Sequence, residues 1–113
     1  MSTEQTTNDF RDELESLCVD CDVMGLSERS GLPHRFLAGG KFREYILRVL
    51  EQFKGNLPPK DDFLKIVGDM YDKYVAPFDI PFIPNFIEPQ IDALIKEEVL
   101  TLAGKLYDRF ASK

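Results

Sequence analysis

Hydrophobic residues recur at intervals of three and four along most of this chain, the spacing that gathers side chains on one face of a helix. The first such stretch covers residues 9–24, and three more cover residues 41–54, 61–76 and 88–111. No stretch alternates with a period of two for long enough to form a strand. The pattern therefore predicts an all-α fold, a small four-helix bundle.

Glycine and proline residues mark where these helices should end or begin. Gly25 and Gly55 suit the ends of the first and second helices, because glycine readily adopts the left-handed conformation at a helix C-terminus. Pro77 should end the third helix, and Pro89 suits the first turn of the fourth. The apolar residues of the fourth helix that we expect to face inward are Ile91, Leu94, Ile95, Val99, Leu102, Leu106 and Phe110.

The proline-containing segment 78–87 is apolar but lacks a helical period. We expect it to lie extended and packed across the bundle, with one subset of its side chains left available for a partner. Phe82 and Phe86 are the candidates for that contact. The remaining organisation is simple, because 113 residues suit one domain. Residues 1–8 should form a flexible polar tail and residues 9–113 a single helical domain.

Two of the predicted helices resemble each other. Residues 60–75 and 96–111 align without a gap at an offset of 36, and the identical pairs are Lys60/Lys96, Leu64/Leu100, Gly68/Gly104, Tyr71/Tyr107 and Asp72/Asp108. A glycine inside a helix costs about 1 kcal/mol relative to alanine, but it allows a close approach. We expect the two helices to cross near Gly68 and Gly104, or each glycine to receive an aromatic ring. A chance match between two amphipathic helices is the alternative.

The charge of −6 is unevenly distributed. Residues 1–25 carry seven acids and one base, whereas residues 26–60 carry seven bases and three acids. An acidic chain argues against general nucleic-acid binding, which needs a basic footprint. No apolar stretch approaches the roughly 20 residues of a membrane-spanning helix, and the N-terminus does not resemble a signal peptide. We therefore expect a cytoplasmic protein that binds neither nucleic acid nor membrane.

Cys18 and Cys21 match the C-x-x-C spacing of redox and zinc sites. The acids Glu15, Asp20 and Asp22 around them disfavour a thiolate. Zinc would need two further ligands, and the chain has one histidine. We expect both cysteines to be reduced, metal-free and at least partly buried, as small residues of an apolar face. No cofactor is expected.

A basic stretch offers a candidate anion site. Its residues are Arg35, Gly39, Gly40, Lys41 and Arg43. If the second helix begins at the Gly-Gly pair, its free N–H groups and the helix dipole would attract a phosphate or carboxylate. The alternative is that this stretch pairs with the acidic first helix of the same molecule.

The sequence contains no motif of the common enzyme classes, and a single histidine limits acid–base chemistry. We expect no enzyme activity. The leading hypothesis is a small protein that acts through protein contacts, as an adaptor, regulator or assembly subunit, with another protein or a second copy as its partner. The alternative is a ligand-binding domain that recognises a phosphate or carboxylate around Gly39–Arg43.

Overall fold

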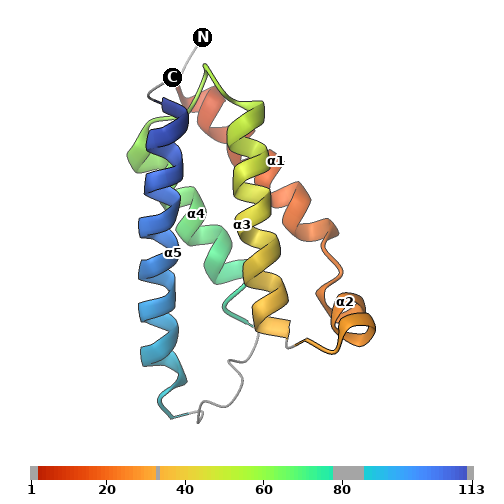
Figure 1. The fold of residues 1–113 in the computed structure, drawn as a ribbon. Helices are drawn as coiled ribbons and strands as arrows, with labels where there is room; N and C mark the ends of the chain where they lie inside the picture. Colours follow the sequence, from red (N-terminus) through yellow and green to blue (C-terminus); the bar gives the residue numbers. More distant parts are fainter. Residues whose placement is uncertain (1–2, 33, 78–85, 112–113) are drawn as a thin grey trace.

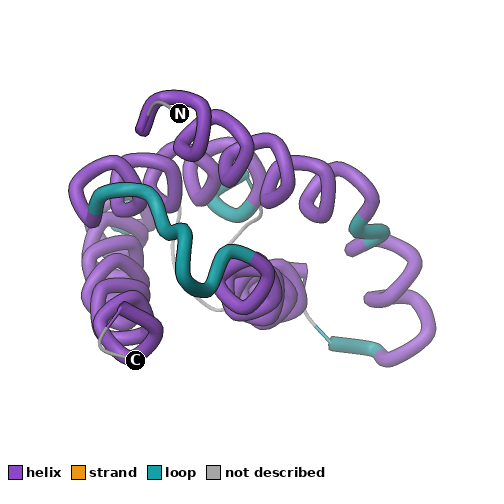
Figure 2. The backbone as a smooth tube through the Cα atoms, turned by 90° about the horizontal axis from the view of Figure 1, so that it is seen from above, coloured by secondary structure: helices purple, strands orange, loops and turns teal. Residues whose placement is uncertain are grey.

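The computed structural model describes residues 3–32, 34–77 and 86–111, and these form helices and loops only (Figures 1 and 2). The five helices are α1 (Thr3–Asp20), α2 (Val23–Ser30), α3 (His34–Gln52), α4 (Lys60–Tyr74) and α5 (Glu88–Ala111). The predicted all-α fold is therefore confirmed. None of the helices within the described ranges has both the length and the apolar character needed to cross a membrane.

The core lies where α1, α3, α4 and α5 meet. Phe10 of α1 is fully buried, with its ring centroid 5.3 Å from that of Phe53 and 5.5 Å from that of Phe63. Phe63 in turn lies 5.0 Å from Tyr107 of α5. The two contacts of Phe10 are edge-to-face, and such aromatic pairs add stability beyond the buried area alone. The aromatic cluster thus ties helices from both ends of the chain together.

The first predicted helix is wrong at both ends. It begins at Thr3 rather than residue 9, so residues 3–8 are helical, and Thr6 is buried. It also stops at Asp20, and a separate helix follows. The Asp22 side chain accepts a hydrogen bond of 3.0 Å from the Gly25 N–H and so caps α2. This local bond competes with continuation of α1, because aspartate favours helix starts over helix interiors.

The second predicted helix also begins earlier than expected. Helix α3 starts at His34, so the pair Gly39 and Gly40 lies inside it instead of at its start. The helix tolerates these glycines because Ala38, Phe42 and Ile46, spaced one turn apart, are buried in the core. Tertiary packing of an apolar stripe commonly outweighs intrinsic propensity.

Helices α4 and α5 begin and end within two residues of the predicted bounds. They pack antiparallel, and their contacts are reciprocal at the 36-residue offset. Lys60 Nζ lies 3.0 Å from an Asp108 carboxylate oxygen, and Lys96 Nζ lies 2.7 Å from Asp72 Oδ2. The pair therefore has an approximate two-fold symmetry.

The two equivalent glycines, Gly68 and Gly104, lie where α4 and α5 cross. Gly68 faces Lys96 and Leu100, whereas Gly104 faces the equivalent residues Lys60 and Leu64. The prediction that the two helices cross near their glycines is confirmed.

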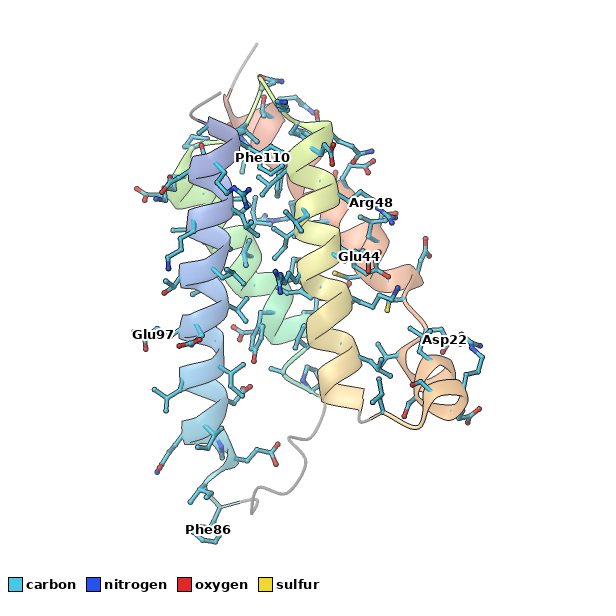
Figure 3. All side chains as sticks on the ribbon, in the orientation of Figure 1. Asp22, Glu44, Arg48, Phe86, Glu97 and Phe110 are labelled. Carbon is cyan, nitrogen blue, oxygen red and sulfur yellow. The ribbon has the colours of Figure 1, made fainter. Side chains whose placement is uncertain are left out.

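Residues 78–85 lie outside the described part of the chain, so the predicted packing of the segment 78–87 is tested only at its end. Phe86 is described and is 81% exposed. It lies at the end of the molecule where α5 begins, and its side chain points away from the helices (Figure 3). Phe86 is thus available for contact, as expected, although the contact itself stays a prediction.

Candidate functional site

Helix α5 is covered along only part of its length. Its buried residues are Ala103, Gly104 and Leu106, all in the C-terminal half, and no residue from Glu88 to Leu102 is buried. Leu94 is 61% exposed and Leu102 is 40% exposed. Figure 1 shows that α5 extends beyond the end of α4. Leu102, however, lies between Leu100 and Gly104, which contact α4, so its exposure means that this side of α5 faces away from α4. The prediction that Leu94 and Leu102 face inward is therefore wrong.

We call this uncovered surface the open face of α5. Its apolar residues are Ile91, Leu94, Ile95, Val99 and Leu102, and Glu98 and Lys105 lie on the same side of the helix. Scattered exposed leucines are ordinary on a protein surface, but a contiguous apolar row is typical of an interaction site. The open face is the strongest such feature in the described residues.

A groove of about 300 Å³ between α3 and α5 continues the open face. Tyr71 of α4 and Val75, which directly follows α4, form its floor, and the α5 wall includes Val99 and Leu102 of the open face. The α3 wall includes Gly39 and Gly40, whose Cβ positions would meet no atom within 4 Å. Side chains at these two positions would narrow the groove, so the glycine pair keeps it open. Arg43, an exposed residue, lies on the same wall.

One premise of the predicted anion site, a helix start at Gly39 and Gly40, is wrong, although ligand binding there stays a prediction. Only the first four N–H groups of an α-helix lack an intrahelical partner, and Gly39 is the sixth residue of α3. The basic side chains also diverge, since Lys41 lines a hollow beside Cys18 whereas Arg43 lines the groove. The side chain of Arg35 lies outside the described part of the structure.

The alternative interpretation of the basic stretch also finds no support among the described side chains. Helix α1 forms its described ion pairs with α4 and not with the basic stretch, between Arg11 and Asp69 and between Glu15 and Lys73. Lys41 instead lies 3.5 Å from Glu44, one turn further along α3. Among the acids of α1, Glu15 is therefore the one shown to contribute to the packing on α4.

The cysteines lie where α1 ends, with Cys18 buried and Cys21 half-buried, and neither forms a disulfide. Burial is the main cause that raises the pKa of the Cys18 thiol to about 12, and the neighbouring Cys21 and Glu15 add to it. Within the described residues, no three histidine, cysteine or acidic side chains come close enough to hold a metal ion. The predicted burial is confirmed.

The Cys18 environment predicts slow alkylation. A thiol with a pKa of about 12 is ionised to roughly one part in 10⁵ at pH 7, and only the thiolate attacks the reagent. In the folded protein, iodoacetamide should therefore modify Cys18 at least about 100-fold more slowly than in 6 M guanidinium chloride. Fragmentation of the tryptic peptide 12–29 by tandem mass spectrometry separates Cys18 from Cys21 and measures both rates, and equal rates at Cys18 would contradict the assigned burial.

Comparison of the chain with known protein families, with curated proteins and with solved structures finds no match. Function is therefore argued from the surface itself. One signal for the open face was present in the sequence, because the apolar stripe of residues 88–111 is longer than its antiparallel neighbour at residues 61–76. A 15-residue helix cannot cover a 24-residue one.

Proposed function

We propose that this protein is non-enzymatic and acts through protein contacts made by the open face of α5. The observation that carries the proposal is the aliphatic row from Ile91 to Leu102, in which Leu94 and Leu102 are 61% and 40% exposed and the other residues are half-buried. Leaving such side chains in water forgoes the roughly 25 cal/mol per Å² that their burial contributes. A partner that covers them recovers this free energy on binding.

The shape of the surface favours an amphipathic helix as the partner segment. Helices α3 and α5 form two walls and α4 forms a floor, so one further helix could lay its apolar stripe into the groove. Glu98 and Lys105 beside the apolar row would then contact the polar flanks of that helix. Charged residues around an apolar centre fix the orientation of a partner more than they add affinity.

The test is site-specific cross-linking of the full chain in its native cells. A photo-reactive amino acid replaces Leu94 on the open face or, as the matched control, Val19, which is 62% exposed on α1. We expect a discrete protein adduct from position 94 and none from position 19. A second change, Leu102→Asp, should lower the yield at position 94 about tenfold while the protein stays helical by circular dichroism.

Two results would contradict the proposal. One is equal cross-linking from positions 94 and 19. The other is an adduct at position 94 that Leu102→Asp leaves unchanged, because the partner would then not depend on the apolar row. An adduct of twice the chain mass would identify a second copy as the partner.

A further inference from the structure

The approximate two-fold symmetry of α4 and α5 indicates which kind of element would cover the open face, because α4 already has a helix packed on its equivalent side. A rotation that exchanges the two helices takes each α4 residue to the α5 residue 36 positions later, as the reciprocal pairs Lys60–Asp108 and Lys96–Asp72 require. The same rotation takes α1, which packs on α4, to a place beside α5. The described chain has no helix in that place.

Helix α1 binds α4 through one stripe of residues. The Thr7 hydroxyl donates to Asp62 at 3.5 Å, Arg11 lies 3.9 Å from Asp69, and Lys73 Nζ lies 2.6 Å from Glu15 Oε2. On α4, the residues of these contacts follow the spacing of a single helix face. Ile66 lies in the same stripe and is 0% exposed.

Hydrogen bonds from Lys73 and then Tyr74 hold the pKa of the Glu15 carboxyl below its ordinary value of 4.5. The Glu15 contact is therefore an ionised one at neutral pH. It fixes α1 on α4 beside the buried stripe.

The equivalent stripe on α5 is uncovered. It consists of Glu98, Leu102 and Lys105, which stand 36 positions after Asp62, Ile66 and Asp69. Ile66 has no exposed surface, whereas its equivalent, Leu102, is 40% exposed. The difference in burial between these two aliphatic residues marks the absence of a covering helix on α5.

We infer that the open face of α5 binds an amphipathic helix of a partner protein in the position on α5 that α1 occupies on α4. The inference rests on the proposed function and names the partner's chemistry. Asp69 is replaced by Lys105 in the equivalent stripe, so the partner should carry a carboxylate where α1 carries Arg11.

The test uses the whole purified protein and two helix-stapled peptides that copy residues 3–20, one with the natural sequence and one with Arg11→Glu. Fluorescence anisotropy measures both dissociation constants. We expect the Arg11→Glu peptide to bind about fivefold more tightly, the range of one exposed ion pair. The variant Lys105→Asp should reverse this preference, and Leu102→Asp should weaken both peptides about tenfold.

The matched control is Asp69→Lys, which changes the equivalent position on α4. A peptide preference that follows position 69 would mean that the peptide displaces the protein's own α1, and the inference would be wrong. The inference would also be overturned if Lys105→Asp leaves the peptide preference unchanged or if neither peptide binds at about 1 mM. A dimer of the protein alone that Leu102→Asp dissolves would replace the partner helix with a second copy.

The two proposals fail separately. An adduct from position 94, combined with peptide affinities that Lys105→Asp does not change, would support the contact surface and reject only the α1-like position of the helix. Loss of cross-linking together with the expected peptide preference would reject the proposed function, although the α5 stripe would still accept a helix.

Discussion

The Phe63→Ala variant is expected to lose about 3–5 kcal/mol of unfolding free energy. Phe63 is 0% exposed and its ring lies between those of Phe10 and Tyr107, at 5.5 and 5.0 Å. Its removal leaves a cavity at the junction of α1, α4 and α5. Small domains have about 5–15 kcal/mol of stability in total, so the variant should be close to unfolding. Urea titration followed by circular dichroism measures the loss.

The symmetry of α4 and α5 supplies the matched control, Val99→Ala, at the position equivalent to Phe63. Val99 is half-buried and lines the open face, so this variant should lose no more than about 1 kcal/mol. If Phe63→Ala prevents folding altogether, Phe63→Leu keeps the comparison measurable. Similar losses at both positions would contradict the conclusion that one face of the helix pair is covered and the other is not.

Replacement of Gly68 or Gly104 by leucine is expected to destabilise the protein by about 1–3 kcal/mol at each position. A methyl group on Gly68 would already lie 3.8 Å from Leu100 Cδ2, and one on Gly104 would lie 3.9 Å from Leu64 Cδ2. The further carbons of leucine would overlap these side chains and force the helices apart. This cost should exceed the roughly 0.8 kcal/mol by which leucine favours a helix over glycine.

Alanine at the same two positions is the control, and its expected effect has the opposite sign. Its methyl group would make contacts of 3.7–3.9 Å, which are ordinary van der Waals distances. Gly68→Ala and Gly104→Ala should therefore stabilise the protein by about 0.5–1 kcal/mol through helix propensity alone. Thermal and urea unfolding of the four variants test the crossing. Leucine variants as stable as the parent would show that the helices do not pack closely there.

The sequence by itself determined α4, α5 and their crossing. Pro58 and Pro59 precede α4, Pro77 follows it, and Pro89 lies in the first turn of α5, so local chemistry limits both helices. The glycines at an offset of 36 marked the crossing, because a small residue leaves room for the long side chains of the facing helix, Leu100 at Gly68 and Leu64 at Gly104. The prolines act on residues next to them in the chain, and the repeated glycines can be found by aligning the sequence with itself, so both can be recognised without a structure.

Helix limits that depend on packing could not be predicted in the same way. Gly39 and Gly40 favour a helix start, but burial of Ala38 and Phe42 on either side carries α3 through them. Conversely, the apolar pattern carries the first helix past residue 20, whereas the Asp22 cap begins a new one. In each case two local preferences compete, and the contacts made across the core decide between them.

Only the tertiary structure decided which residues of α5 form the open face, because the sequence indicated no more than a difference in length between the apolar stripes of residues 88–111 and 61–76. Helical periodicity places Leu94, Leu102 and Leu106 toward the same side of α5, and by sequence all three are equally suited to a core. Leu106 is buried while Leu94 is exposed, because Leu106 belongs to the core, whereas no described helix covers the side of α5 on which Leu94 lies. A period reports which side chains share a face, whereas burial depends on the length and position of the neighbouring helix.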